Sequence, residues 1–208
     1  ATVAIEDKDF FKHGGFDVRG ISRAAVNNVT GGGGGKQGGS TITQQLVRLT
    51  QKGVGQEQTY QRKLRELILS IELERSYTKK EILAGYLNAA PYGNVQYGVE
   101  TASRDYFQKS AKDLTLDEAT FLASIPKSPS YYSPYGPRYN PEALVGRQHY
   151  TLDLMEQQGM ITAQQRDEAK KVDTLAKVHQ VKPKFEGIKA PYFVLLAKSQ
   201  LEQKYTKD

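Results

Sequence analysis

The sequence contains no cysteine and no tryptophan, has only three histidines, and has no apolar run long enough to cross a bilayer. The lack of cysteine excludes disulfide bonds and thiolate metal sites, and it leaves the redox compartment undetermined. His13, His149 and His179 are too scattered to suggest a zinc site. No signal peptide is visible, but the chain begins inside the apolar segment ATVAIED, so we expect a fragment of a longer protein.

The chain has 208 residues, which is enough for one large domain or two small lobes around a real core. Lysine and arginine total 29 against 23 aspartates and glutamates, a formal net charge of +6. This excess favours acidic partners such as phosphates, anionic lipid or nucleic acid. Because no basic-aromatic motif accompanies the charge, we expect no nucleic-acid partner.

Helix signals dominate the sequence. Asn140-Pro141 predicts a helix start, and Gly159 predicts the end of that helix. Alternating strand patterns are scarce before APYFVLL near the C-terminus, so the fold class is predicted to be mainly α. Capping boxes, in which a threonine caps a helix and a Glu or Gln three residues later reaches back, are predicted at Thr78 with Glu81, Thr115 with Glu118, and Thr162 with Gln165.

Residues 30–39, TGGGGGKQGG, form the one low-complexity segment. Glycines cannot offset their ordering entropy by burial, so the segment is predicted to be a mobile loop. Gly33, Gly35 and Gly38 satisfy a G-x-G-x-x-G pattern trivially, and no strand precedes them. Lys36 is not followed by the Ser or Thr of a P-loop, so we expect no nucleotide site here.

The opening stretch VAIEDKDFFKHGGFD places an acidic pair, two aromatics, a histidine and a glycine turn directly behind an apolar run. One interpretation is a helix end, with Glu6 and Asp7 in solvent and Gly14-Gly15 stopping the helix. The other is a carboxylate partly shielded from water by its neighbours, as a general base requires. These residues alone leave both interpretations open.

The stretch GGSTITQQLVRLTQK predicts a helix with Ser40 as its N-cap. The two preceding glycines leave backbone N–H groups open to an anion, so a diphosphate or a sugar hydroxyl would fit there. The polar residues after Gly39 suit the wall of a polar cleft. The alternative is an ordinary capped helix with Gln44 and Gln45 in solvent.

The stretch YQRKLRELILSIELERSY predicts a helix with an apolar stripe on one side and a charged cluster on the other. Arg62, Lys63 and Glu66 form the cluster. On an open surface they would be a weak ion pair, whereas in a partly enclosed place they would hold a phosphate beside a carboxylate. The stripe consists of Leu64, Leu67, Ile68 and Ile71.

The stretch TKKEILAGYLN predicts another capped helix. Its spacing places one set of apolar side chains in the core and leaves Asn88, at the helix end, as the candidate for a functional role. The core set consists of Ile82, Leu83, Tyr86 and Leu87.

Four of these stretches, EDKDFFKHGG, GGSTITQQL, RKLRE and KKEILAGYLN, occur in the order and approximate spacing of a known set of motifs. The chain resembles the peptidoglycan glycosyltransferases, the family 51 domain of class A penicillin-binding proteins and monofunctional transglycosylases. The resemblance extends to about residue 170, and IKAPYFVLLAKSQLEQKY is similar to the start of the linker toward a transpeptidase domain. It implies a glycosyltransferase domain over residues 1–180 and the start of that linker over residues 181–208.

The resemblance implies a lysozyme-like helical lobe with a smaller, membrane-facing jaw at approximately residues 15–60. It implies an enzyme on the extracytoplasmic face of the bacterial plasma membrane, which polymerises lipid II with inversion at C1 and releases undecaprenyl diphosphate. The implied partners are lipid II, the growing lipid-linked strand, the membrane surface and a fused C-terminal transpeptidase domain.

The resemblance also assigns residues. Glu6 matches the family's general base and Glu66 its second carboxylate. No metal ligand is assigned, and a divalent cation, Mg²⁺ or Mn²⁺, at the diphosphate is the candidate cofactor. The positions matching substrate-binding residues are Asp7, Phe10, Ser40, Thr41, Gln44, Gln45, Arg48, Arg62, Lys63 and Asn88.

The residues suit this chemistry. A sugar hydroxyl needs a base within hydrogen-bonding reach, and a diphosphate leaving group needs neutralisation, which Arg48, Arg62 and Lys63 would supply. Arg48 stands where many relatives have lysine, which keeps the charge but alters its geometry. His13 is interpreted as a structural hydrogen-bonding residue. The side chains expected to shield the base from water are Val3, Ile5, Phe10 and Phe11.

Two other functions remain as alternatives. A hydrolase or lytic transglycosylase of similar fold would need a general acid, and the cations around Glu66 disfavour a protonated carboxyl group. A non-catalytic basic module that binds membrane or anionic polymer would spread its charge along a polar face, whereas here the cations gather around particular carboxylates.

Overall fold

The structure is a computed structural model, and it describes residues 1–17, 39–51, 60–93 and 96–179. Within these ranges all regular secondary structure is helical, apart from an isolated β-bridge between Pro91 and Tyr97, so the mainly α prediction is confirmed. The glycine loop, most of the predicted jaw, and the expected linker with its APYFVLL segment lie outside the described residues.

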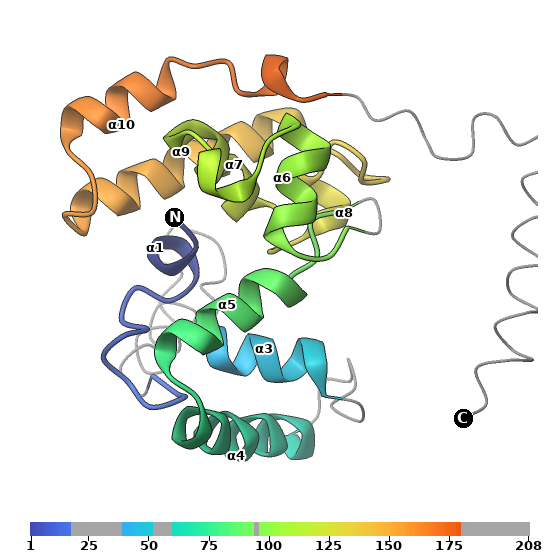
Figure 1. The fold of residues 1–208 in the computed structure, drawn as a ribbon, viewed down its shortest axis with the longest axis vertical. Helices are drawn as coiled ribbons and strands as arrows, with labels where there is room; N and C mark the ends of the chain where they lie inside the picture. The colour runs from blue at the N-terminus through green and yellow to red at the C-terminus, as the bar shows by residue number, and fades with distance from the viewer. Residues whose placement is uncertain (18–38, 52–59, 94–95, 180–208) are drawn as a thin grey trace, which may run out of the picture. The chain divides into compact units, whose positions relative to one another are not determined.

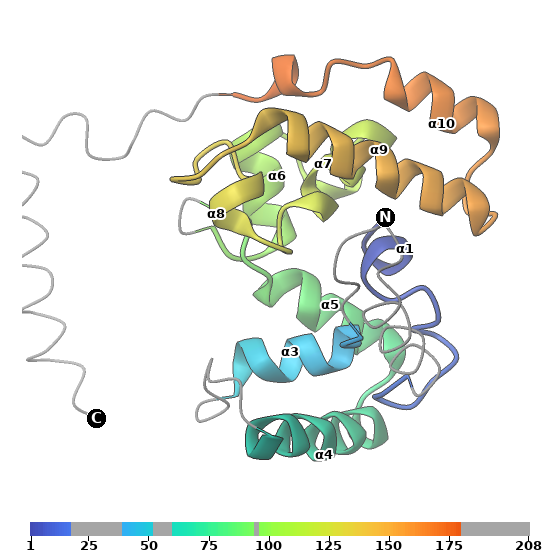
Figure 2. The ribbon, with the colours of Figure 1, turned by 180° about the vertical axis from the view of Figure 1, so that it is seen from behind.

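The described helices belong to one compact unit, Ala1–Val178. Figures 1 and 2 show α3, α4 and α5 together at one end of it. The helices are α1 (Thr2–Glu6), α3 (Ile42–Thr50), α4 (Tyr60–Ser76), α5 (Lys79–Ala89), α6 (Val99–Phe107), α7 (Leu116–Ser124), α8 (Pro129–Tyr132), α9 (Pro141–Gln157) and α10 (Ala163–Lys170), with 3₁₀ turns η1 (Ala111–Asp113) and η2 (Leu175–Lys177).

The helices form two groups that share one hydrophobic core. Helix α3 packs against α4 and α5, while α9 packs against α7, α10 and α1. Phe10, Ile42 and Tyr86 from the first part of the chain and Phe121 and Leu144 from the second belong to a single cluster of buried side chains. The end of α1 is therefore placed between elements of both groups.

The predicted helix starts are largely confirmed. Thr78, Thr115 and Thr162 each cap a helix in a complete capping box, which satisfies backbone N–H groups that the helix itself leaves unpaired. Asn140 caps α9 by accepting a hydrogen bond from the Ala143 N–H at 2.9 Å. The predicted core positions of α5 are also confirmed, since its apolar side chains are buried or pack against the core.

Helix α4 does not bury its apolar stripe. Leu64 and Ile68 are exposed, with 59% and 58% of their surface accessible, whereas Glu66 and Ser70 are completely buried. The inward face of this helix therefore carries a buried carboxylate and a buried hydroxyl beside Leu73, which packs against the core. It packs against α3, whose N-terminal turn supplies polar partners.

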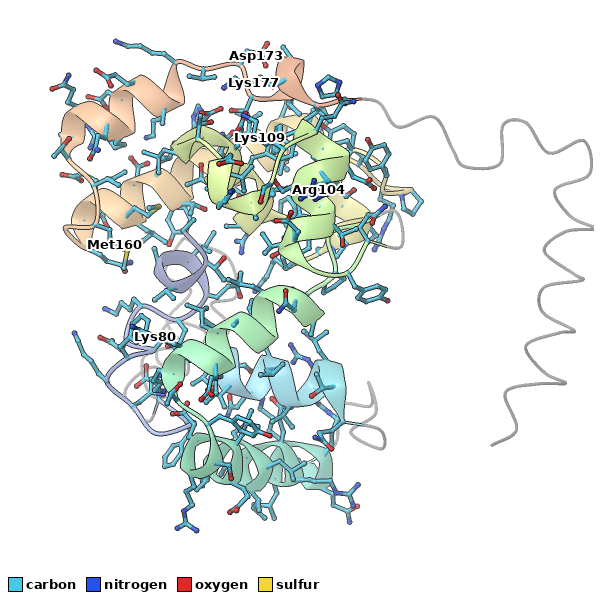
Figure 3. All side chains as sticks on the ribbon, viewed as in Figure 1. Lys80, Arg104, Lys109, Met160, Asp173 and Lys177 are labelled. Atoms are coloured by element: carbon cyan, nitrogen blue, oxygen red, sulfur yellow. The ribbon has the colours of Figure 1, made fainter. Side chains whose placement is uncertain are left out.

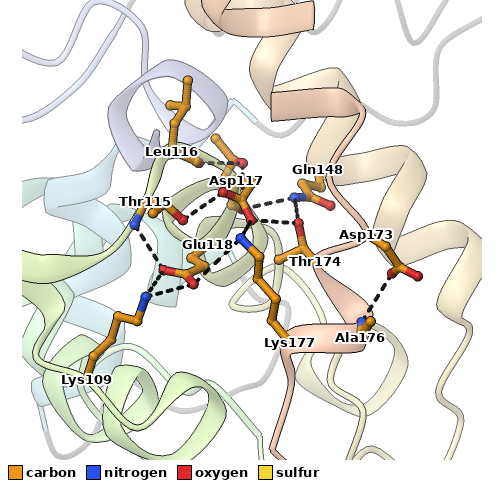
Figure 4. A network of polar contacts seen from close by, with 11 residues as sticks. Lys109, Thr115, Leu116, Asp117, Glu118, Gln148, Asp173, Thr174, Ala176 and Lys177 are labelled. Carbon is orange, nitrogen blue, oxygen red and sulfur yellow. Dashed lines mark hydrogen bonds and ion pairs between the residues drawn. The ribbon is translucent and has the colours of Figure 1, made fainter. Parts of the chain in front are cut away.

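A polar network holds the end of the compact unit in place (Figure 4). Lys177 donates to Asp117 at 2.9 Å, Lys109 donates to Glu118 at 2.9 Å, and Gln148 on α9 bridges the Asp117 carbonyl and the Thr174 hydroxyl. Figure 3 shows Lys109 and Lys177 near one another beside α7. The network connects α7 to α9 and so holds α9 in position. Helix α9 carries Arg147, a residue of the candidate site described below.

Candidate active site

Glu6 ends α1, and its carboxylate is held from two sides. The Gln45 side chain donates from Nε2 to Oε2 at 3.1 Å, and Arg147 donates from Nη2 to Oε1 at 2.8 Å. Only 10% of the Glu6 side chain is exposed. The predicted helix end is present at Glu6, but the expectation that Glu6 and Asp7 lie in solvent is wrong, because the Glu6 side chain is largely shielded and each of its oxygens accepts a hydrogen bond, and Asp7 is buried.

Arg147 is the site residue that the sequence analysis missed. Its Nε donates to the Ser124 carbonyl at 3.1 Å, and its guanidinium lies 5.5 Å from the centroid of the Tyr132 ring. These contacts fix the guanidinium beside Glu6. No local pattern in the sequence distinguishes Arg147 from the other arginines, so only its contacts reveal it.

Asp7 fastens the end of α1 to the start of α3. Its Oδ2 accepts a hydrogen bond from the Ile42 backbone N–H at 3.0 Å, and its carboxylate is 2.9 Å from His13 Nε2. A carboxylate at this position complements the positive end of the helix dipole. The structural interpretation of His13 is therefore confirmed, and Asp7 has the same kind of role.

The first turn of α3 corrects the predicted cap. Thr41, not Ser40, is the N-cap: its hydroxyl accepts from the Gln44 N–H at 3.2 Å, and the Gln44 side chain accepts from the Thr41 N–H at 3.1 Å. Thr41 also donates to the Gly15 carbonyl at 2.8 Å, which ties α3 to the preceding turn. Thr41 and Gln44 thus build the helix start, and this leaves Ser40 available for another partner.

That partner belongs to the Glu66 cluster. Lys63 Nζ lies 2.9 Å from Ser40 Oγ and 2.7 Å from Glu66 Oε1, and Arg62 Nη1 lies 2.8 Å from Glu66 Oε2. The Glu66 side chain is fully buried, but 44% of the Lys63 side chain is exposed. The prediction that the cluster is partly enclosed is therefore confirmed, and an ion pair on an open surface is excluded. The Lys63 side chain is the partly exposed member of the cluster.

The remaining predicted residues differ in how far they are exposed to solvent. Phe10 is fully buried in the core, with Lys79 above its ring, so it lies behind the site rather than in it. Phe11 is 58% exposed and does not shield Glu6 as expected. Arg48 is exposed in the last turn of α3, and Asn88 is exposed at the end of α5.

The donor set of the described residues does not fit a resident metal ion. Within the parts of the chain that the structure describes, no group of three or more His, Cys, Asp or Glu side chains is arranged so that it could hold a metal ion. Both oxygens of Glu66 already accept from cationic side chains, and those of Glu6 accept from Arg147 and Gln45. We therefore assign no step to a metal ion held by these side chains.

The described helices also include none that is long and apolar enough to cross a membrane.

Comparisons with known proteins identify the family. Residues 1–156 match the family described as Transglycosylase. Penicillin-binding protein 2D of Bacillus subtilis is 43% identical over 204 residues, which cover 98% of this chain and 28% of that protein. Penicillin-binding protein 1A of Aquifex aeolicus is 40% identical over 205 residues, covering 99% of this chain and 27% of that protein.

Penicillin-binding protein 1A of Neisseria gonorrhoeae is 44% identical over 169 residues, covering 81% of this chain and 20% of that protein. Among solved structures, penicillin-binding protein 1A of Haemophilus influenzae matches with a TM-score of 0.46 and 21% identity, over 80% of this chain and 20% of that one. The chain spans between 20% and 28% of the length of these curated relatives. By its family match and these identities, the chain belongs to the transglycosylase family and is a glycosyltransferase domain of the kind found in class A penicillin-binding proteins.

Proposed function

We propose that this domain is a peptidoglycan glycosyltransferase that polymerises lipid II, with Glu6 as the general base. The observation that carries the proposal is the combination of a buried, oriented carboxylate at the end of α1 with a cationic cluster near the start of α3. Gln45 and Ser40, which contact these two groups, lie five positions apart in the sequence.

In the proposed reaction, the 4-hydroxyl oxygen of lipid II attacks C1 of the lipid-linked growing strand. Glu6 accepts the hydroxyl proton as the new C–O bond forms. The bond from C1 to the diphosphate oxygen breaks on the opposite face of the sugar, so the configuration at C1 inverts. Each Glu6 oxygen accepts one hydrogen bond in the structure and has a further lone pair for the incoming proton.

The leaving undecaprenyl diphosphate takes the electron pair of the broken bond and needs its charge neutralised. Lys63 is suited to this role, because Glu66 and Ser40 hold its ammonium while 44% of its side chain is exposed. Arg62 completes the cluster, and the exposed Arg48 adds a third cation. We propose that a divalent cation would arrive with the diphosphate, because the side chains of the described residues form no cage for it.

The substrate implies where the enzyme works. A polymerase of a lipid-anchored disaccharide acts at the membrane surface, so we propose that the domain acts on the outer face of the plasma membrane, with its jaw against the lipid. The relatives are named penicillin-binding proteins and are several times longer than this chain. We propose that the full protein likewise carries a transpeptidase domain.

The test is polymer formation from purified lipid II by the wild type, Glu6→Gln and a matched control, Glu72→Gln. Glu72 is on the exposed face of α4, with 67% of its side chain accessible. We expect Glu6→Gln to fold and to lower turnover by roughly two to four orders of magnitude. The control should retain wild-type turnover. A folded Glu6→Gln protein with near-normal polymerisation would overturn the assignment of Glu6 as the base, and a wild type that forms no polymer would overturn the proposed polymerase function.

A further inference from the structure

We propose that Tyr86 is a positioning residue for the base, which acts through Gln45 to hold the Glu6 carboxylate in one orientation. This inference rests on the proposed function of Glu6. Tyr86 lies on α5, Gln45 on α3 and Glu6 at the end of α1, so the three side chains connect three helices.

The contacts form a continuous chain. The Tyr86 hydroxyl donates to Gln45 Oε1 at 3.2 Å, and Gln45 Nε2 donates to Glu6 Oε2 at 3.1 Å. Tyr86 is 1% exposed and belongs to the hydrophobic core. Because the ring is fixed by packing, the hydroxyl is presented to Gln45 from a rigid support.

The direction of these hydrogen bonds follows from the chemistry of the groups. An ionised carboxylate can only accept, so the amide nitrogen of Gln45 must face Glu6 and the amide oxygen must face Tyr86. Burial raises the pKa of Tyr86, and the nearby negative charge of Glu6 acts in the same direction. Tyr86 therefore stays protonated over the whole working range of pH and donates to that oxygen.

Without the Tyr86 hydroxyl, the amide oxygen of Gln45 loses its hydrogen-bond donor, and only the carboxylate then determines which end of the amide faces Glu6. The Gln45 side chain is then less restrained, and whenever it leaves this geometry Glu6 keeps only the hydrogen bond from Arg147. Loss of one such hydrogen bond is expected to lower kcat about 5- to 20-fold, because the base would spend less time in its reactive orientation.

The experiment is a double-mutant cycle in the lipid II assay, with Tyr86→Phe, Gln45→Ala, the double variant and Glu6→Gln. We expect Tyr86→Phe to lower kcat with little change in KM. In the Gln45→Ala background the same substitution should have no further effect, because Tyr86 would then have no residue through which to act.

Tyr106→Phe is the matched control. Its buried hydroxyl donates to the Tyr92 carbonyl at 2.6 Å and lies 2.7 Å from Ser133 Oγ, away from the chain that ends at Glu6. Its removal should alter thermal stability but leave kcat unchanged. A loss of kcat shared by both tyrosine variants in proportion to their loss of stability would show a purely structural role and overturn the inference.

The outcomes separate this inference from the proposed function. If Glu6→Gln is inactive while Tyr86→Phe retains wild-type kcat, or lowers kcat equally with and without Gln45, then the positioning role is wrong and the base assignment stands. If Glu6→Gln polymerises lipid II normally, the assignment of Glu6 as the base is wrong, and the positioning role is wrong with it, whereas failure of the wild type to polymerise lipid II would overturn the proposed function itself.

Discussion

The Nη2 atom of Arg147 lies 2.8 Å from Oε1 of Glu6, although 141 positions of sequence separate the two residues. This contact joins the middle of α9 to the end of α1. Arg147 is itself held by the Ser124 carbonyl and the Tyr132 ring. The orientation of the proposed base therefore depends on the correct packing of the C-terminal half of the domain.

We predict that Arg147→Gln lowers turnover about 10- to 100-fold, because the carboxylate loses a fixed cationic partner. The measurement is the rate of polymer formation from lipid II. Arg104→Gln, which removes an exposed partner of Glu100, is the control and should keep wild-type turnover.

Wild-type turnover in Arg147→Gln, together with reduced thermal stability, would show that the ion pair serves only to hold α1 and α9 together. The turnover of Arg147→Lys should also fall, because an ammonium group cannot contact Glu6 and the Ser124 carbonyl in the same geometry.

Substitutions in the cluster of Arg62, Lys63 and Glu66 should distinguish a polymerase from a glycan hydrolase. Arg62→Ala and Lys63→Ala should each remove about 2 to 4 kcal/mol of transition-state stabilisation if the leaving group is a diphosphate. Glu66→Gln should also impair turnover, because Glu66 orients both cations. Arg75→Ala, at a site with 75% of the side chain exposed, should have no effect.

The measurement uses labelled lipid II in one set of reactions and purified glycan strands in the other. A hydrolase has no diphosphate to neutralise, so its cutting would survive these substitutions. Soluble fragments released from glycan strands by the wild type and the cation variants alike would contradict the polymerase proposal.

Gly15 should not tolerate a side chain. Its φ is +84°, and an added Cβ would lie 2.8 Å from the Ser70 carbonyl oxygen of α4. We expect Gly15→Ala to lower the free energy of unfolding by about 1 to 3 kcal/mol. Gly14→Ala is the adjacent control, because nothing lies within 4 Å of its Cβ position. Equal thermal midpoints for the two variants would contradict this account.

The contact between Lys177 and Asp117 should give a pH-dependent contribution to stability. Desolvation acts to raise the pKa of Asp117, but hydrogen bonds from Lys177, Thr115 and Thr174 outweigh it and hold that pKa below its usual value. Because the pKa of Asp117 is lower in the folded state, its ionised form stabilises the fold at any pH above its unfolded-state pKa of about 3.9. This stabilisation is lost as the pH falls through the folded-state pKa.

Lys177→Met should therefore lower the free energy of unfolding by about 1.5 to 3 kcal/mol at neutral pH. The difference from wild type should stay constant down to about pH 4 and shrink below it, as Asp117 becomes protonated in both proteins. Urea unfolding at several pH values measures this, with Lys80→Met, at an exposed position of α5, as the control. A difference that does not shrink in acid would show that packing, rather than charge, is responsible.

The helical class, most helix starts and the motifs that mark the family could all be predicted from the sequence. These signals are local: a capping box needs only a threonine and an acceptor three residues later, as at Thr78 and Thr162. The ion pairs of Glu66 with Arg62 and Lys63 could also be predicted from the sequence, because residues three and four positions apart meet on one side of any helix.

Tertiary structure alone decided which side of α4 faces inward and which partners Glu6 has. Helical spacing shows that Leu64 and Glu66 lie on different sides of the helix, but only the packing of α3 against α4 buries the glutamate and exposes the leucine. Arg147 reaches Glu6 because α9 packs against α1. Such contacts depend on how the chain closes over long sequence separations, and no local periodicity or propensity contains that information.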